Sequence, residues 1–201
     1  MNSLSLSRRP EIVLPQTLDV AGKTCAIRPD FRNILRIFRL LDDPEIADRH
    51  KAMKLVDLFY IDTPQPLKAG VEAFFAFLRG YERRHDPDAA SIDYEFDADV
   101  IYASFLHAYR IDLLDPALTM HWYAFTGLIN GLTDDSALCE RLRLRKLDTK
   151  HLKGKAKTSA EIARRNAQPP KKISETEREL QSALTQALRE GKDPNTLLGY
   201  E

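Results

Sequence analysis

Apolar side chains recur at helical spacing through most of the first 145 residues, and this period restricts the fold more than any other feature. The clearest case follows Asp30, a residue type suited to cap a helix N-terminus. The apolar positions are Phe31, Ile34, Leu35, Phe38 and Leu41, with Arg32, Arg36 and Arg39 between them. This spacing predicts an amphipathic helix that buries the apolar stripe and turns its arginines to solvent.

Five further helices are predicted along the same part of the chain. The second and fifth are expected to begin at Asp43-Pro44 and Asp115-Pro116, because an N-cap residue followed by Pro is a helix-start signal. The third is expected from Pro66 to Arg84, the fourth from after Asp97 to about Arg110, and the sixth from Thr133 to Arg145. The apolar stripes of these helices indicate one shared core.

A short β-hairpin is predicted before the helices, over Thr17–Ile27, with its turn at Ala21-Gly22-Lys23. Gly22 tolerates the positive φ that such a turn requires. The predicted fold is therefore mainly α: a compact helical domain of about six helices with an N-terminal hairpin, spanning residues 12–147. Residues 1–11 are polar and are predicted to form a flexible N-terminus.

The charge is distributed unevenly, although the formal net charge is zero. Between Arg141 and Lys172 twelve basic residues face two acidic ones, so the rest of the chain is acidic. Residues 148–173 contain few apolar residues and are predicted to be a basic linker, with a short helix near Ser159–Asn166. The chain is thus expected to join an acidic helical body to a basic, partly helical C-terminal extension.

The last part of the extension, residues 174–201, is predicted to be a separate helix and tail. Ser174 and Glu177 form a capping box, and Gly191 is the stop signal. The apolar seam is narrow and its leucines are Leu180, Leu184 and Leu188. A seam of this width favours pairing with another helix over forming a core.

The sequence favours a protein without catalytic activity, because motifs for a nucleophile, a metal or a bound nucleotide are missing from it. No cofactor is predicted. Cys25 and Cys139 lack CxxC partners and are interpreted as unpaired thiols in a reducing compartment. No stretch approaches the ~20 apolar residues of a membrane-spanning helix, and the N-terminus lacks a signal-peptide pattern, so a cytoplasmic location is predicted.

Two other hypotheses remain open at this stage. Asp93, Glu95, Asp97 and Asp99 alternate along the chain and could bind a divalent cation, although acidic residues also favour a helix N-terminus. The basic segment 141–172 could bind nucleic acid in a salt-dependent manner. It contains no aromatic residue for base stacking, so the sequence favours a solvated arm, or an arm that meets an acidic protein, at least as much as nucleic-acid binding.

Five ordered pieces of the sequence resemble the tail assembly chaperones of long-tailed phages. They are the helix start DFRN at Asp30–Asn33, the Asp-rich entry to an aromatic helix, the YxIDL link from Tyr109, the triplet His121-Trp122-Tyr123 and the closing Arg143-Leu144-Arg145. The resemblance covers about Leu14 to Asp148. Two features depart from it. Tyr123 stands where the family often has a second Trp, and the basic extension follows the matching part.

The resemblance implies a non-enzymatic protein that coats the tape-measure protein before the tail tube polymerises around it. It also implies a place in the host cytoplasm and absence from the finished virion. In related systems a longer form recruits tail-tube protein, and the basic extension is compatible with such a form. Many weak contacts along a filament favour self-association, so a homo-oligomer is expected.

Partner-binding residues are predicted where polar or amphipathic side chains leave the core stripes. Tyr and His suit interfaces because they combine an apolar body with a polar tip. The predicted residues are Tyr102, Tyr109, His121, Tyr123, Arg143, Arg145, Leu180, Leu184 and Leu188. Trp122 and Phe125, by contrast, are predicted to belong to the core.

Overall fold

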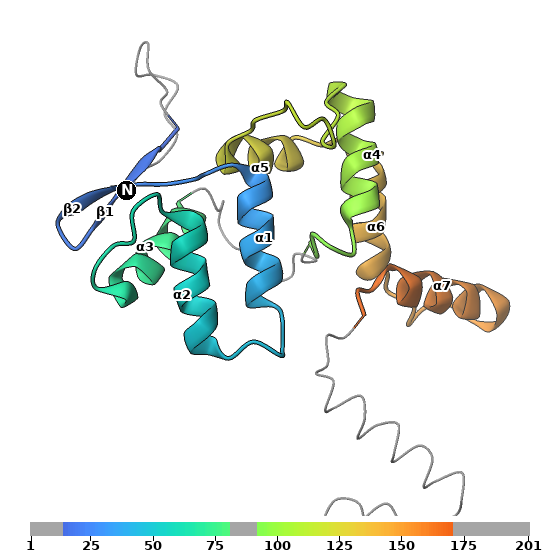
Figure 1. The fold of residues 1–201 in the computed structure, drawn as a ribbon. Helices are drawn as coiled ribbons and strands as arrows, with labels where there is room; N and C mark the ends of the chain where they lie inside the picture. Colours follow the sequence, from blue (N-terminus) through green and yellow to red (C-terminus); the bar gives the residue numbers. More distant parts are fainter. Residues whose placement is uncertain (1–13, 81–91, 171–201) are drawn as a thin grey trace, which may run out of the picture.

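An antiparallel hairpin opens the part of the chain that the computed structural model describes, residues 14–80 and 92–170 (Figure 1). Its strands are β1 (Thr17–Val20) and β2 (Lys23–Ala26), and β1 packs on α3. The two turn residues, Ala21 and Gly22, have φ angles of 53° and 79°, as a type I′ turn requires. The predicted hairpin and its turn are confirmed.

Three helices form the N-terminal half of the fold: α1 (Phe31–Leu41), α2 (Asp48–Phe59) and α3 (Leu67–Arg79). α2 packs between α1 and α3. Asp30 caps α1 as predicted, and its side chain accepts a hydrogen bond from the Arg32 amide. α2 does not begin at Asp43-Pro44, because the Asp43 carboxylate instead accepts the Glu45 amide at 2.9 Å and closes a turn.

A second group comprises α4 (Ala98–Tyr109), α6 (Ala137–Arg145) and α7 (Gly154–Ala167), with α6 in contact with both others. α6 starts at a Ser136 cap, three residues after the predicted Thr133. α7 has 14 residues and packs on α6, so the helix here is longer than the one predicted near Ser159–Asn166. Residues 1–13 and 171–201, including the predicted helix with Leu180, Leu184 and Leu188, lie outside the described residues.

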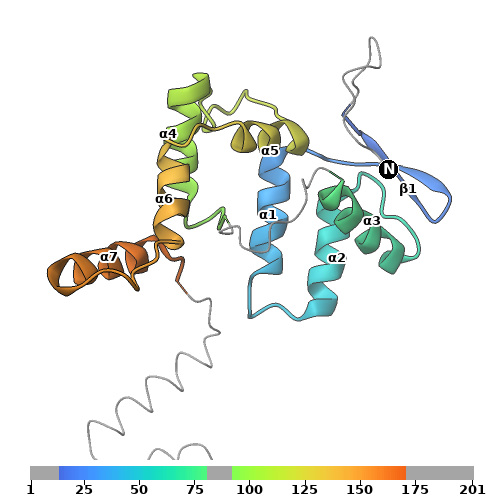
Figure 2. The same cartoon turned by 180° about the vertical axis from the view of Figure 1, so that it is seen from behind.

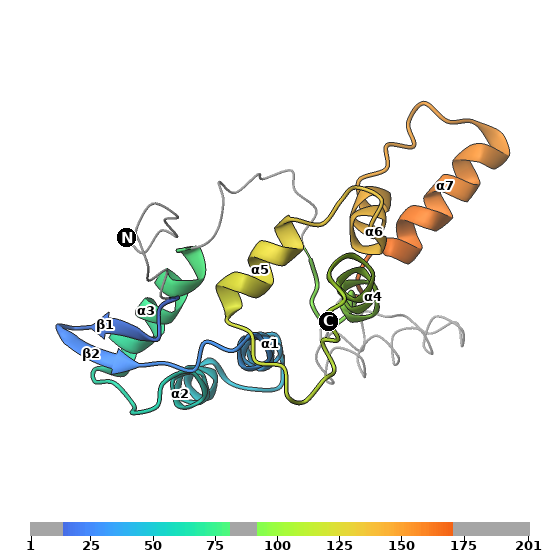
Figure 3. The same ribbon diagram turned by 90° about the horizontal axis from the view of Figure 1, so that it is seen from above.

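Helix α5 (Trp122–Asn130) lies across the ends of the two groups and connects them (Figures 1 and 2). Its Phe125 ring stacks on Phe31 of α1 at 4.7 Å and on Phe105 of α4 at 5.3 Å. Figure 3 shows α5 between the two groups when the molecule is seen from above. Phe125 and Trp122 are buried, as predicted for core residues.

The segment before α5 corrects a second predicted helix start. The Asp115 carboxylate accepts the Ala117 amide at 2.9 Å, and α5 begins only at Trp122. An Asp-Pro pair therefore makes a turn at both positions where it was expected to begin a helix. Among the helices in the described ranges, none is long and apolar enough to cross a membrane.

Candidate functional site

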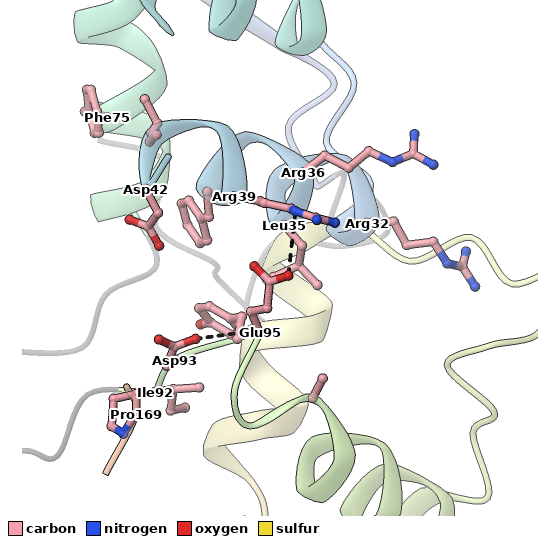
Figure 4. A pocket seen from close by; sticks show the side chains of 14 residues that line it. Arg32, Leu35, Arg36, Arg39, Asp42, Phe75, Ile92, Asp93, Glu95 and Pro169 are labelled. Carbon is pink, nitrogen blue, oxygen red and sulfur yellow. Dashed lines mark hydrogen bonds and ion pairs between the residues drawn. The ribbon is translucent and has the colours of Figure 1, made fainter. Parts of the chain in front are cut away.

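A hollow of about 890 Å³ lies between α1 and the segment that leads into α4 (Figure 4). We call it the α1 groove. It is lined by Arg32, Leu35, Arg36, Phe38, Arg39, Leu41, Asp42, Phe75, Ile92, Asp93, Tyr94, Glu95, Ala98 and Pro169. The groove thus lies where the two helical groups meet, a position that proteins often use for binding.

Aromatic rings form the floor of the α1 groove. The Phe38 ring stacks on Tyr94 with their centroids 5.7 Å apart. Beneath them Trp122 of α5 makes edge contacts, at 5.4 Å to Phe38 and 5.7 Å to Tyr94. Trp122 is itself buried, so the floor is anchored in the core. Such a floor offers apolar contact area without having to be assembled when a ligand arrives.

Charged side chains of opposite sign stand along the two walls of the groove (Figure 4). Arg36 and Arg39 are exposed on α1, and Asp93 and Glu95 stand on the facing segment. Arg39 Nε and a Glu95 carboxylate oxygen are 3.6 Å apart, so one ion pair spans the groove. Both of its side chains are more than half exposed, and a pair of this kind contributes only about 0–1 kcal/mol.

The DFRN residues at the start of α1 fix this helix to the rest of the protein. The Asp30 carboxylate accepts amides from both Arg32 and Met120. The Asn33 side-chain amide donates to the carbonyls of Arg28 and Leu58, both at 3.0 Å. This motif, found in the sequence as a family resemblance, therefore positions the basic wall of the groove.

Arg32 belongs to the same motif, and its predicted solvent orientation is wrong. Its guanidinium donates to the backbone carbonyls of Leu113, Asp115 and Leu118 in the loop before α5. The fixed fork of an arginine can serve several acceptors in this way. Only Arg36 and Arg39 of the three α1 arginines are exposed.

The four alternating carboxylates that could have bound a cation are directed to other partners. Asp97 is fully buried and bonds Arg145 of α6 at 2.6 Å, while its second oxygen accepts the Asp93 amide. Asp99 forms a two-pronged pair with Arg141, and this hydrogen bond lowers the pKa of Asp99 below its usual value. Within the described ranges no group of three or more His, Cys, Asp or Glu side chains could hold a metal.

Two predicted partner-binding residues, His121 and Tyr123, are not on the surface. His121 is 9% exposed and caps α5, with Nδ1 accepting the Tyr123 amide and Nε2 bonded to the Pro15 carbonyl at 3.0 Å. Tyr123 is 3% exposed and donates its hydroxyl to the Phe77 carbonyl, and burial raises its pKa to about 12. The expected surface position is wrong because α3 covers the face of α5 that the stripe left free.

The remaining described candidates divide between the core and the surface. Tyr109 is half-buried and donates to the Leu128 carbonyl, and Tyr102 is half-buried against the core. Arg145 is buried on Asp97, which corrects its predicted surface position, whereas Arg143 is exposed and pairs with Glu140 of its own helix. None of these four residues lines the α1 groove.

The sequence pattern did not predict the groove, although it identified several of the residues that line it. Leu35, Phe38 and Leu41 were assigned to the buried stripe of α1, yet all three are only partly buried. The side chain that completes the buried face is Ile37, which the stripe did not include. The apolar stripe of α1 is wider than the face that the core covers. This excess of apolar side chains was the sequence signal for an exposed apolar edge on α1.

Comparison with known proteins gives one match. The family model described as Bacteriophage Gp15 protein matches residues 12–169, from before β1 to the end of α7. A search of curated proteins and a search of solved structures each give no match. The matched range includes α7, so most of the basic segment 141–172 belongs to the family region. It is therefore not an extension beyond the family, as the resemblance had suggested.

Proposed function

This chain belongs to the bacteriophage Gp15 protein family, and from that premise we propose that it is a tail assembly chaperone that binds the tape-measure protein without catalysing a reaction. The order of its sequence motifs resembles that chaperone group, and the family match gives independent support for a phage protein. The tape-measure protein is expected to be long and helical, and to need cover until tail-tube subunits surround it.

The α1 groove is the observation that carries this proposal. It combines an aromatic floor with charged walls, and an amphipathic helix binds such a surface through its apolar face. α1 has 11 residues and is about 16 Å long, which matches about three turns of a partner helix. A protein of this kind would grip successive helical segments of one long partner.

Three further parts of the proposal follow from the same role. The chain would act in the host cytoplasm and would be absent from the finished virion. It would self-associate, because several copies on one filament bind more firmly than one. Its C-terminal extension would provide the place for a second partner, the tail-tube protein.

The test is co-expression with the tape-measure protein, which we expect to be the product of a long helix-rich reading frame next to the gene of this chain. We expect the chaperone to raise the soluble yield of that product and to co-purify with it. Leu35→Asp and Phe75→Asp, which place a charge in the groove, should abolish both effects. Ile61→Asp is the matched control, since Ile61 is 55% exposed and lies outside the groove. If the yield is unchanged by wild-type protein and nothing co-purifies, the proposed role is wrong.

The nucleic-acid hypothesis is weaker, because the three arginines at the start of the basic segment are engaged. Arg141 and Arg145 bind Asp99 and Asp97, and Arg143 binds Glu140. The lysines of α7 remain exposed. Retention on DNA at ~50 mM salt, lost steeply as salt rises, would favour this second function.

A further inference from the structure

The walls of the α1 groove differ in the charge that they can offer to a ligand. On α1 the exposed cations are Arg36 and Arg39, since Arg32 is engaged by three backbone carbonyls. On the facing segment Glu95 is exposed, and the partly buried Asp93 adds negative charge although its carboxylate accepts the amides of Glu95 and Phe96. A helix seated in the groove would therefore meet the positive charge of Arg36 and Arg39 along most of the α1 side, with Asp42 at the C-terminal end of that side, and negative charge along the facing segment (Figure 4).

The Arg39–Glu95 pair is the contact that such a helix must replace. It crosses the groove at 3.6 Å, and its side chains are 78% and 56% exposed. An ion pair this accessible to water is weak and opens readily. When a ligand enters, Arg39 and Glu95 can each exchange their partner for an oppositely charged side chain of the ligand.

The floor of the groove determines which side chains a ligand helix needs between its two charged flanks. Leu35 and Phe38 on α1, Tyr94 opposite and Phe75 from α3 present apolar side chains. Phe75 is 38% exposed, so part of its ring is available to a ligand. A single row of Leu or Phe side chains at positions i, i+3/i+4 and i+7 of a ligand helix would cover this floor.

We propose that the α1 groove binds an amphipathic helix of the partner polypeptide with a narrow apolar seam, acidic residues on the flank beside Arg36 and Arg39, and basic residues on the flank beside Asp93 and Glu95. This rests on the proposed function, because it names the kind of partner segment that the chaperone recognises. The two flanks also fix the direction in which the helix lies, since turning it end to end would put like charges together.

Two synthetic helical peptides without Trp test this proposal on the full chain. Both carry the same leucine seam. The mixed peptide has one acidic and one basic flank, and the basic peptide has two basic flanks. Trp122 is the sole tryptophan of the chain and touches Phe38 and Tyr94, so its emission reports on the groove floor.

Wild-type protein should bind the mixed peptide about tenfold more tightly than the basic peptide, with a change in Trp122 emission. The double variant Arg36→Glu, Arg39→Glu has two acidic walls and should reverse this preference. A matched control is Arg49→Glu with Lys54→Glu on α2, which leaves the groove unchanged and should keep the wild-type order. Salt should reduce the discrimination in both proteins.

Three outcomes would overturn the proposal. One is equal affinity for the two peptides in wild-type protein, and another is an order that the double variant leaves unchanged. The third is peptide binding that appears only after Leu180, Leu184 and Leu188 are changed to Asp. That result would mean that the C-terminal segment of this chain, and not a partner, is the ligand of the groove. If the tape-measure product co-purifies equally with the double variant, the groove assignment fails while the chaperone role stands. If the peptides behave as expected and the tape-measure product never co-purifies, the groove assignment stands and the chaperone role fails.

Discussion

Arg145 and Asp97, 48 residues apart in the chain, form a buried ion pair at 2.6 Å. The Arg145 side chain is 4% exposed and that of Asp97 is fully buried. Arg145 Nε also donates to the Ala167 carbonyl at 2.7 Å, and its guanidinium lies 5.7 Å from the Phe96 ring centroid. One side chain of α6 therefore holds the start of α4 and the end of α7.

Removing either partner of this pair should be strongly destabilising, because the other charge would stay buried and lose its shortest ion pair. Arg141, 3.6 Å from Asp97, is a longer second partner and replaces that contact only in part. We expect Arg145→Met and Asp97→Asn each to lower the free energy of unfolding by about 3–5 kcal/mol, measured by urea denaturation at neutral pH. Arg143→Met is the matched control, two positions away on the same helix. Its pair with Glu140 is exposed and should contribute less than about 1 kcal/mol. Equal effects at the two arginines would show that Arg145 has no special role.

Arg32 provides a second prediction, on how the loop before α5 is held. We expect Arg32→Lys to destabilise the protein by about 1–3 kcal/mol, because an ammonium cannot serve the carbonyls of Leu113, Asp115 and Leu118 with the same geometry. Protease cleavage within residues 111–120 should also become faster. Arg36→Lys, one helical turn away and exposed, should change neither measurement. A cleavage rate that does not change in Arg32→Lys would contradict this role.

Local features of the fold were predictable, because they depend on neighbouring residues alone. The turn at Ala21-Gly22 and the cap at Asp30 are of this kind. The Asp-Pro pairs at Asp43 and Asp115 failed as helix starts, since an aspartate side chain can close a turn on the amide two residues on as well as cap a helix. The sequence signal for the two outcomes is the same.

Features that depend on distant partners were not predictable in the same way. Asp97 was placed correctly just before α4, but its carboxylate makes no capping bond and binds Arg145 instead. Tyr123 lies off the apolar stripe of α5 and is nevertheless buried, because Phe77 of α3 stacks on it at 4.8 Å. Periodicity within one helix cannot show which faces a second helix will cover, so the candidate groove also escaped notice.

Gly70 carries a third prediction, which runs against helix propensity. Alanine is normally preferred to glycine inside a helix by about 0.5–1 kcal/mol. In α3, however, a Cβ at Gly70 would lie 2.8 Å from Pro64 Cγ and 3.5 Å from Val56 Cγ2. The Tyr60 hydroxyl also donates to the Gly70 carbonyl at 2.8 Å, so the helix has little freedom to move away.

We therefore expect Gly70→Ala to lower the free energy of unfolding by about 1–3 kcal/mol, as overpacking does elsewhere. Glu72→Ala tests the same helix at an exposed position and should stay within about 0.5 kcal/mol of wild type. Urea unfolding of the two variants gives the comparison. A stabilised Gly70→Ala protein would mean that Pro64 moves aside.

His121 makes stability depend on pH through a single buried ring. Burial lowers its pKa below the ordinary value of 6.5, against a smaller opposing effect of the hydrogen bond to Pro15. With Nδ1 accepting the Tyr123 amide, the neutral ring must carry its proton on Nε2, which donates to the Pro15 carbonyl. Protonation would place a hydrogen on Nδ1 where the α5 cap needs an acceptor.

Since the pKa is lower in the folded state than in the unfolded state, the neutral ring contributes its full stability above about pH 6.5. That contribution should be lost as the pH falls below 6.5 and through the lowered folded pKa. We expect wild-type protein to lose more unfolding free energy between pH 7.5 and 5.5 than His121→Asn, whose side chain can cap but does not titrate. The variant should be less stable overall, because it loses ring contacts with Phe77 and Tyr123, but this loss is the same at both pH values. The two proteins differ at this position alone, so parallel pH curves would rule out His121 as the responsible group.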